Sequence, residues 1–412
     1  MVFSLARYGP EYEKITADFI TKPPYSMHRH APRIAEIQPF HVMRILEEAK
    51  RLEATGRDVI HLEVGEPDFP TPPLIIEAGM KALAEQKTFY TGAAGLPQLR
   101  EAIAGFYRDR LGVTVDPARI IVTPGASGAL QLILALLVGR DAELLLSDPT
   151  YPCNRHLLSL FEGRAINIAV GAESRFQLTA AQIEQNWTAK TVGALVASPA
   201  NPTGTVLEPD EIAAMATVCR RRGGALIVDE IYQGLVYGRP HETALAVADD
   251  VFVVNSFSKF FQMTGWRLGW LVAPEQHIPA LEKLAQNLFL AAPTPAQYAA
   301  LAAFHPDTLA LLETRRQILD QRRQCLAGLL LDLGFDLPAP AQGAFYLWAD
   351  ARRHTRDAAG LAQRILQEQA VAITPGLDFS RTGAQHFLRF AYTQDLSRLK
   401  EAAERIARVI SG

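Results

Sequence analysis

The stretch ALIVDEIYQGLVYGRPHETALAVADDVFVVNSFSK, residues 225–259, decides the fold class of this chain. It contains two short runs, ALIVD at 225–229 and VFVVNS at 251–256, that are apolar until their last residues. Runs of the same kind lie upstream: IIVT at 120–123, LLLS at 144–147, AINIAV at 165–170 and VGALVAS at 192–198. Apolar strands that alternate with helical patterns are typical of a mainly parallel sheet covered by helices on both faces. The sequence therefore predicts an α/β fold.

The pattern changes near residue 300, which predicts a second and smaller domain. A long helix from about residue 296 through Leu331, strands at 344–348 and 387–391, a helix near 361–369 and a closing helix indicate an α+β unit. Apolar residues at helical spacing from Val42 to Leu52 predict a helix that completes this unit. We therefore expect an N-terminal extension over 1–30, a large domain over 69–300, and a small domain built from 31–68 and 301–412.

Composition excludes several classes of function. The 412 residues carry 41 Lys and Arg against 44 Asp and Glu, a net charge of −3, so no basic excess favours binding to nucleic acid. The longest apolar stretch, residues 129–138, is too short to cross a membrane, and no signal-peptide pattern is present. The three isolated cysteines favour buried thiols in a reducing, cytoplasmic setting and offer no metal-ligand spacing.

No GxGxxG, P-loop, GxSxG or HExxH signature is present, but polar residues follow several of the expected strands. The segment Thr123–Gly128, TPGASG, follows IIVT and opens an apolar helix. Small residues at a helix N-terminus let backbone N–H groups approach a phosphate, and Ser127 can add a hydroxyl donor. The alternative is an ordinary glycine-rich turn in which Ser127 caps the helix.

Two further strand ends present an amide and a carboxylate. The rigid turn SPANPTG at 198–204 directs Asn201 toward the expected crevice, although an Asn in such a turn can instead bond its own backbone. Asp229 ends a buried strand, where a carboxylate is costly unless it meets a cation or a strong donor. Its alternative role is to cap the turn that comes next.

Lys259 is the most informative of these residues. It ends a strand among aromatic residues, where burial lowers the pKa of an amine and favours Schiff-base chemistry. The alternative is a solvated surface residue, which is the usual place of a single Lys. Arg267, eight residues on, offers donors suited to a phosphate. Asn201, Asp229 and Lys259 are separated by 28 and 30 residues, about one strand-helix-strand repeat each, so we expect them at one sheet edge. This set is typical of a site for pyridoxal 5'-phosphate.

The chain resembles the class I/II aminotransferases, pyridoxal-phosphate enzymes of fold type I. The resemblance runs from about residue 33 to the C-terminus and rests on an ordered set of motifs: GEPDFPTP at 65–72, TFYTGAAGLPQLREAIA from 88, TPGASGAL, DPTYP, SPANPTG, VDEIY, SFSK with GWRLGW, and FLRFAY. It implies an enzyme that transfers the α-amino group of an L-amino acid to a 2-oxo acid by a ping-pong mechanism.

Carried over by position, the resemblance assigns roles toward the cofactor. Lys259 forms the Schiff base and then acts as acid and base, Asp229 bonds the pyridine nitrogen, and Tyr232 bonds the ring oxygen together with Asn201. Tyr151 stacks on the ring. The phosphate is implied to be held by Ala126, Ser127, Ser256 and Arg267.

The resemblance also assigns residues to the substrate and to a partner subunit. Arg389 is implied to clamp the substrate α-carboxylate beside Gly65 and Asn201; otherwise it is a partly exposed arginine on an edge strand. Tyr90 is implied to reach the phosphate of the neighbouring subunit in a homodimer.

Two features of the sequence bear on packing and on specificity. Gln262 stands where the family usually has a small residue, which leaves the packing beside the lysine loop open. Ser127 stands where some bacterial aspartate aminotransferases have a lysine for the distal carboxylate, so a preference for dicarboxylates is unsupported. Residues 37–42, with Phe40, are candidates for the side-chain pocket, where Phe40 would suit an apolar or aromatic donor.

Two other functions stay open at this point. A pyridoxal-phosphate C–S lyase, similar to cystathionine β-lyase, shares the same Lys, Asp, Tyr and Arg set. A regulatory protein on this fold would need an added DNA-binding domain, for which about 35 residues ahead of the fold leave no room.

Overall fold

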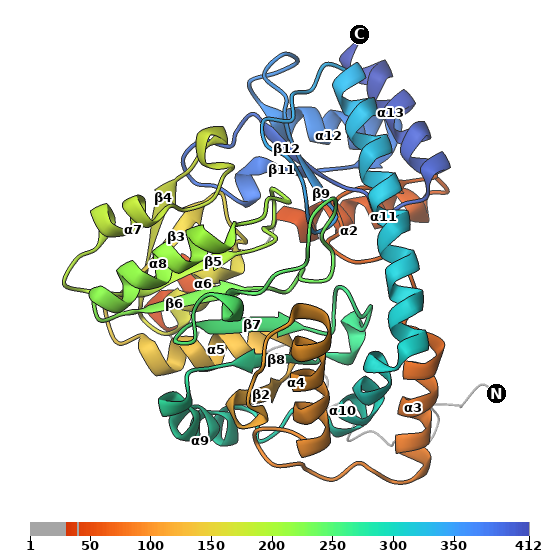
Figure 1. Ribbon diagram of the computed structural model, residues 1–412. Coiled ribbons are helices and arrows are strands. Elements are labelled where there is room, and N and C mark those ends of the chain that lie inside the picture. The colour runs from red at the N-terminus through yellow and green to blue at the C-terminus, as the bar shows by residue number, and fades with distance from the viewer. Residues whose placement is uncertain (1–29, 39–40, 412) are drawn as a thin grey trace, which may run out of the picture. The chain divides into compact units, whose positions relative to one another are not determined.

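The computed structural model describes residues 30–38 and 41–411, and the chain divides into two compact units, 1–38 and 39–412. In the described part of the first unit, one short 3-10 helix, η1 (Pro32–Glu36), has no buried residue. The second unit contains all the remaining elements, including every predicted strand of the α/β fold (Figure 1).

Helices and strands alternate through most of this unit. The α-helices are α2 (His41–Ala54), α3 (Pro73–Ala84), α4 (Pro97–Leu111), α5 (Gly125–Leu137), α6 (Cys153–Leu160), α7 (Ala180–Asn186), α8 (Pro209–Arg221), α9 (Ile278–Leu288), α10 (Thr294–Leu301), α11 (Pro306–Asp332), α12 (Ala358–Gln369) and α13 (Leu396–Ile410). The strands are β1 (Ile60–His61), β2 (Ile120–Thr123), β3 (Glu143–Asp148), β4 (Arg164–Ala169), β5 (Thr191–Ala197), β6 (Ala225–Asp229), β7 (Phe252–Ser256), β8 (Gly269–Val272), β9 (Tyr346–Asp350), β10 (Val371–Ala372), β11 (Thr374–Pro375) and β12 (Phe387–Ala391).

The main sheet has seven strands in the order β2-β8-β7-β6-β5-β3-β4. All its pairings are parallel except those of β8, which runs antiparallel to both β2 and β7. The predicted mainly parallel sheet is thus confirmed. Strand β8 was not predicted, because four residues directly after a glycine-rich turn carry little signal of their own.

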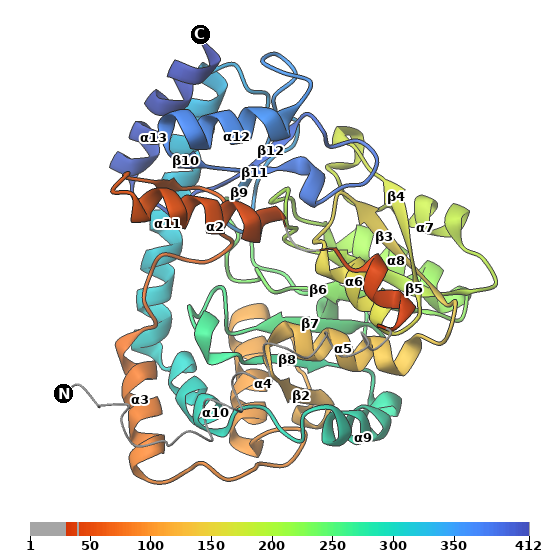
Figure 2. The same ribbon diagram turned by 180° about the vertical axis from the view of Figure 1, so that it is seen from behind.

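Each strand of this sheet contributes to two separate apolar cores, one on each face. Neighbouring residues point in opposite directions along a strand, so Ile121 and Ile227 join one core while Val122 and Val228 join the other. Helices α5, α6 and α9 contribute to the first core, and α4, α8 and α10 to the second (Figures 1 and 2). Burial on both faces explains why these strands are apolar throughout.

The C-terminal part builds a three-stranded antiparallel sheet, β11-β12-β9. Helix α12 and the N-terminal helix α2 both contact this sheet. Strand β1 pairs with β10 in parallel, so residues 60 and 61 join this part of the fold. Helix α11 runs from η7 (Ala302–Phe304) toward β9 and α13 (Figure 1). The boundaries at residues 69 and 300 between the large and the small domain stay a prediction.

The structure corrects the single helix expected from about residue 296 through Leu331. Helix α10 ends at Leu301, and α11 begins at Pro306 with His305 as its N-cap, whose ring accepts from the Asp307 N–H. Proline is favoured at the first position of a helix and disfavoured in the interior, which places the break here. Strand β9 also starts two residues later than expected, because Ala344 has φ +59°.

The cysteines differ from expectation as well. Cys219 is buried, but Cys153 and Cys325 are partly exposed, so the prediction of three buried thiols is wrong for two of them. None of the helices within 30–38 and 41–411 combines the length and the apolar character needed to span a membrane.

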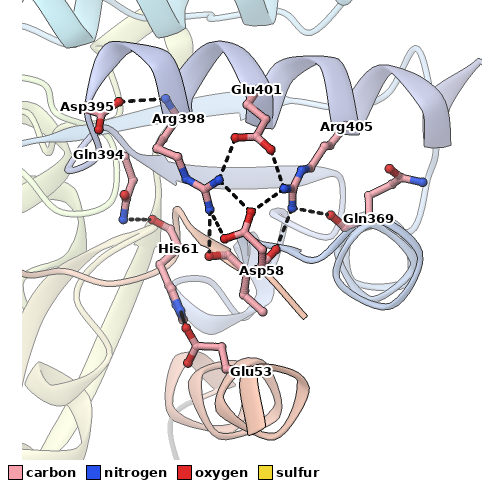
Figure 3. A network of polar contacts seen from close by, with 10 residues as sticks. Glu53, Asp58, His61, Gln369, Gln394, Asp395, Arg398, Glu401 and Arg405 are labelled. Atoms are coloured by element: carbon pink, nitrogen blue, oxygen red, sulfur yellow. Dashed lines mark hydrogen bonds and ion pairs between the residues drawn. The ribbon is translucent and has the colours of Figure 1, made fainter. Parts of the chain in front are cut away.

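A polar network fastens β1 and the segment before it to α13 (Figure 3). The Asp58 carboxylate accepts from Arg398 at 2.7 Å and from Arg405 at 2.6 Å, and Glu401 pairs with the same two arginines. On the other side, His61 bonds Glu53 of α2 at 3.2 Å and the buried Glu63 at 2.8 Å. These contacts hold the chain just ahead of Gly65.

Candidate active site

One cavity of about 600 Å³ opens where β5, β6 and β7 end, and residues from the small sheet complete its wall. In an open α/β sheet, this is the edge at which ligands bind. Eleven of the twelve residues proposed from the sequence line it: Gly65, Ala126, Ser127, Tyr151, Asn201, Asp229, Tyr232, Ser256, Lys259, Arg267 and Arg389.

The N-terminus of α5 forms one end of the cavity. The helix begins at Gly125, which has φ +71° and on which a Cβ would lie 2.6 Å from Nη2 of Arg267. Pro124 is the N-cap and Ser127 lies inside the first turn, so the alternative that Ser127 only caps the helix is wrong. Backbone N–H groups, the Ser127 hydroxyl and a guanidinium therefore meet at a helix N-terminus, which is favourable for an anion.

Ser256 and Arg267 complete this end of the cavity. The Ser256 hydroxyl donates to the Ser258 Oγ at 3.0 Å, and Ser256 is the last residue of β7. Arg267 adopts φ +54°, and its Nη1 donates to the Thr264 carbonyl at 2.9 Å. That local bond holds the guanidinium beside Gly125.

Asp229 and Lys259 lie deeper along the sheet edge. Burial raises the pKa of Asp229 to about 6, against the opposing effects of the Ile231 N–H and the Lys259 charge. One carboxylate oxygen accepts from the Ile231 N–H at 3.0 Å, so Asp229 caps the turn with Oδ1 and also lines the cavity.

Lys259 presents a primary amine to the cavity. It donates to the Gly65 carbonyl at 2.5 Å and lies 5.8 Å from the Tyr232 ring and 5.7 Å from the Phe345 ring. Burial lowers its pKa to about 8; Glu66 opposes this shift, and the charges of Arg389 and Arg267 add to it. The lowered pKa expected from its aromatic flanks is confirmed.

Arg389 closes the cavity from the small sheet. It is 3% exposed and lies on β12, the central strand of its sheet, so the edge-strand alternative is wrong. Its Nη1 donates to Asn201 Oδ1 at 2.9 Å, and its Nη2 donates to the Glu63 carbonyl and to the Thr374 hydroxyl. Asn201 therefore bonds across the cavity rather than to its own turn. In the described part of the chain, the buried Nε of Arg389 has no partner.

Comparison with known proteins identifies the family. Residues 57–406 match the model of the family described as aminotransferase class I and II. The chain belongs to this family. It is 37% identical to a valine–pyruvate aminotransferase of Mycobacterium tuberculosis, over 90% of this chain and 96% of the relative. It is 34% identical to an aspartate aminotransferase of Geobacillus stearothermophilus, over 92% and 98%. A solved aminotransferase from Mycobacterium tuberculosis matches the structure with a TM-score of 0.90 at 36% identity, covering 93% of this chain and 100% of the other.

The protein is therefore an aminotransferase of fold type I, as its resemblance implied. Enzymes of this family use pyridoxal 5'-phosphate and exchange nitrogen between amino acids and 2-oxo acids. None of these comparisons favours the C–S lyase alternative.

Tyr151 and Tyr90 stand in contrasting places in this aminotransferase. Tyr151 lines the cavity, and burial is the main cause that raises the pKa of its phenol. Tyr90 is 81% exposed and does not line the cavity of its own chain. Of residues 37–42, proposed for the side-chain pocket, Val42 lines the cavity, and Phe40 lies outside the described residues.

Gln262 packs well despite its unusual size for the family. It is 5% exposed with φ +56°, and its side-chain oxygen accepts from Arg315 of α11. Its carbonyl accepts from the Thr71 hydroxyl at 2.8 Å. The larger side chain thus ties the lysine loop to α11, which answers the question that the sequence left open.

Sequence reasoning missed several residues of the aminotransferase cavity. Glu66 and Ser258 lie within the quoted motifs GEPDFPTP and SFSK but had been given no role. The others lie in none of the quoted motifs and reach the cavity only through the fold: Met43, Tyr346, Asp378 and Phe379. Tyr346 is the most closely tied to the predicted residues, since its hydroxyl lies 2.9 Å from that of Tyr232. An aromatic residue in a buried strand gave no signal, because core strands are commonly aromatic.

Proposed function

We propose that this aminotransferase binds pyridoxal 5'-phosphate in the cavity and transfers the amino group of monocarboxylic L-amino acids with uncharged side chains to 2-oxo acids. The observation that carries the proposal is the unpartnered, buried Nε of Arg389 in the same cavity as the Lys259 amine. A buried donor without a partner is costly, and an α-carboxylate would satisfy it beside the reacting amine.

The residues present fit the phosphate of the cofactor. A side chain at Gly125 would occupy the space between the start of α5 and Arg267, so the glycine keeps a cradle open there. We assign the phosphate to the backbone N–H groups at Ala126 and Ser127, to the hydroxyls of Ser127 and Ser256, and to Arg267. A dianion there would receive charge-assisted hydrogen bonds from Arg267 and the favourable end of the α5 dipole.

The groups deeper in the cavity fit the ring. Asp229 would hold a proton on the pyridine nitrogen, whose positive charge offsets the cost of burying the carboxylate. Tyr232 and Asn201 would donate to the ring oxygen; the Asn201 amide nitrogen can do so because Oδ1 is occupied by Arg389. Tyr151 would cover one face of the ring.

The chemistry then depends on Lys259. When bound, pyridoxal phosphate supplies an aldehyde that condenses with primary amines and a ring that draws electrons from the substrate α-carbon. Lys259 supplies the amine that binds the aldehyde, and its pKa of about 8 leaves part of it neutral near pH 7. After an amino acid displaces that amine, the Lys259 Nζ can carry the proton lost from the substrate α-carbon. The amino acid would leave as a 2-oxo acid, and a second 2-oxo acid would then take up the nitrogen by the same steps in reverse, which is the ping-pong pattern.

The charges of the cavity support uncharged donor side chains. Its lining cations, within the described part of the chain, are Lys259, Arg267 and Arg389, and each is already assigned to the cofactor or to the α-carboxylate. Two carboxylates, Glu66 and Asp378, also line it and would repel a second carboxylate of the substrate. The remaining wall near α2 is apolar, with Val42 and Met43. The valine–pyruvate aminotransferase among the relatives supports the same substrate class.

We also propose that the enzyme is a homodimer in which Tyr90 completes the partner's phosphate site. Tyr90 and Phe89 are each 81% exposed, and large apolar side chains are exposed on α3 and after α9, among them Met80, Leu83 and Leu290. The Thr294 hydroxyl donates to the Phe89 carbonyl at 2.7 Å, which brings the segment at 89–90 beside the start of α10. Exposed apolar surface of this kind marks an interface.

The proposal is tested by the absorbance of the purified protein after pyridoxal phosphate is added and unbound cofactor is removed. We expect a visible band that valine, alanine or leucine bleaches without an acceptor and that pyruvate restores. Aspartate and glutamate should act at least about tenfold more weakly, because the cavity lacks a cation for the second carboxylate. A protein that forms no band contradicts the cofactor, and preferential bleaching by aspartate contradicts the substrate class.

The dimer has its own test. Sedimentation should give twice the chain mass of 45.2 kDa. Mixed dimers of Lys259→Ala and Tyr90→Phe chains should regain one fully wild-type site per dimer, and hence cofactor retention that neither parent has. A monomer in solution, or no gain on mixing, contradicts the shared site.

A further inference from the structure

Tyr346 is a buried residue of the cavity wall that has no role among those proposed for the cofactor and the substrate. It is the first residue of β9, it is fully buried, and its phenol reaches the cavity. Its hydroxyl lies 2.9 Å from that of Tyr232, and the two rings meet edge to face at 5.7 Å and 81°. It is therefore in direct contact with a residue proposed to bond the cofactor.

The contact between the two hydroxyls limits where the proton of Tyr232 can point. A phenol has one proton to donate and can accept through its oxygen. If Tyr346 donates to Tyr232, the Tyr232 proton is available for the ring oxygen of the cofactor, and the chain of two hydrogen bonds strengthens that donation. Without the Tyr346 hydroxyl, the Tyr232 oxygen loses a donor in a buried setting.

The ring of Tyr346 faces the substrate side of the cavity. The guanidinium carbon of Arg389 lies 4.2 Å from the centre of the Tyr346 ring and 4.7 Å from that of the Phe379 ring. Arginine stacks on aromatic faces, and two such contacts restrict the plane of its fork. The unpartnered Nε–H lies in that plane, so fixing the plane fixes the direction in which Arg389 can donate to a carboxylate.

Gly65 completes the surroundings of Tyr346. A Cβ on Gly65 would lie 2.6 Å from the Tyr346 hydroxyl oxygen, so the glycine leaves space for this phenol. The Gly65 carbonyl accepts from Lys259 at the same time. One phenol thus contacts the groups proposed for the ring oxygen and for the substrate carboxylate, and it lies against the loop that bonds the lysine.

We infer that Tyr346 is a positioning residue, whose hydroxyl orients Tyr232 toward the cofactor ring oxygen and whose ring orients Arg389 toward the substrate carboxylate. This inference rests on the proposed function. It assigns the two effects to two different parts of one side chain, so the two can be separated by substitution.

Two nearby tyrosines show what a purely structural phenol looks like in this fold. Tyr237 and Tyr392 are fully buried, and their hydroxyls donate to the Ala344 carbonyl at 2.7 and 3.2 Å. Neither lines the cavity. Tyr237→Phe is therefore a matched control that removes a buried phenolic hydroxyl without touching the site.

The test compares Tyr346→Phe, Tyr232→Phe, the double variant and Tyr237→Phe as holoenzymes, by titrating the visible absorbance band with pH. A donor at the ring oxygen stabilises the more negative, deprotonated form of the cofactor, so its loss raises the titration midpoint. We expect Tyr346→Phe to raise the midpoint by about half a unit or more, which is a few-fold change in the proton affinity. The double variant should match Tyr232→Phe alone, because the hydroxyl acts through Tyr232. Tyr237→Phe should leave the midpoint unchanged.

A second variant, Tyr346→Leu, removes the ring as well. We expect the KM of the amino donor to rise by a further factor of about 3 to 10 relative to Tyr346→Phe, since Arg389 loses a stacking partner. An unchanged midpoint in Tyr346→Phe, or effects of the two hydroxyls that add in the double variant, overturns the inference. If the wild-type protein forms no band, the proposed function fails first, and the inference fails with it.

Discussion

The guanidinium of Arg389 donates from Nη1 to the amide oxygen of Asn201 at 2.9 Å, which joins β12 of the small sheet to the turn after β5 of the main sheet. Both residues are at least nine-tenths buried. The bond occupies one side of the Arg389 fork and one atom of the Asn201 amide. The groups that remain, Nε of Arg389 and Nδ2 of Asn201, are those proposed for the substrate and for the cofactor.

Replacing Arg389 by lysine should preserve binding of the cofactor and weaken binding of the amino-acid substrate. Lysine keeps the positive charge but cannot hold the Asn201, Glu63 and Thr374 acceptors and also offer a donor at the position of the Arg389 Nε. We expect kcat/KM for the amino donor to fall by about 100-fold, equivalent to about 2.7 kcal/mol, while the visible band stays at wild-type strength. Steady-state kinetics and the spectrum measure the two effects. Arg364→Lys, on the exposed surface of α12, should change neither; a nearly unaffected Arg389→Lys enzyme would contradict the assignment.

The pH at which the protein without cofactor takes up pyridoxal phosphate should report the amine of Lys259. Its pKa is lowered from 10.5 to about 8, so the neutral, nucleophilic fraction grows as the pH rises through 8 and not through 10.5. We expect the rate of band formation to rise by about tenfold between pH 7 and pH 9. Stopped-flow absorbance measures this rate. Lys259→Arg should form no band at any pH, whereas Lys283→Arg, at an exposed site, should behave as wild type; a midpoint above pH 10 would refute the lowered pKa.

Gln262→Ala should affect stability more than chemistry. The substitution removes the bond to Arg315 of α11 and leaves the left-handed backbone at φ +56°. The loss of one partly buried hydrogen bond to a charged group costs about 2 kcal/mol, which should lower Tm by roughly 2–4 °C. Calorimetry measures Tm, and kinetics should show kcat within a factor of about 3. Gln324→Ala, at the exposed end of a bond within α11, is the control; a large loss of kcat with unchanged Tm would be inconsistent with a packing role.

The ion pair of His61 with Glu63 should make stability depend on pH above neutrality. The hydrogen bond with buried Glu63 is the main cause that raises the pKa of His61 from 6.5 to about 9. Because the folded state holds this proton more tightly than the unfolded chain, the stabilisation is complete below pH 6.5 and is lost as the pH rises through 9. The excess in Tm of the wild type over His61→Gln should therefore shrink by a few degrees between pH 7 and pH 9.5. Thermal scans at several pH values measure this difference in Tm. The control is His305→Gln, because His305 is half exposed at the start of α11. If the Tm values of wild type and His61→Gln change in parallel with pH, the ion pair is not the cause of the pH dependence.

Much of the fold could be predicted because burial on both faces leaves a clear mark on the sequence. Strands β2 and β6 were predicted to the residue, since an apolar run between polar turns has few other interpretations. The break between α10 and α11 was not predicted, because the apolar spacing continues across Ala302–Phe304 and only His305–Pro306 interrupts it. Strand β8 depends on pairing with β2 and β7, which distant residues supply.

The residues of the candidate site likewise fall into those that the sequence could predict and those that it could not. Asn201, Asp229 and Lys259 could be found because each follows a strand and all strand ends meet at one edge. Tyr346 and Phe379 could not, because aromatic side chains in strands and turns are usually core, and their contact with Arg389 exists only once the small sheet has formed. The role proposed for Tyr90 requires a second chain, about which a single sequence gives no geometry.

The carboxylates and apolar residues that line the cavity beside α2 have a consequence for how the enzyme could diversify. Met43 is 51% exposed on the first turn of that helix, so its side chain is replaceable without disturbing the packed core. The residues proposed for the phosphate, Lys259, and the Arg389 guanidinium proposed for the substrate carboxylate all come from other elements. If the proposed roles hold, selection for a different amino donor can act on one accessible position while the residues proposed for catalysis stay unchanged.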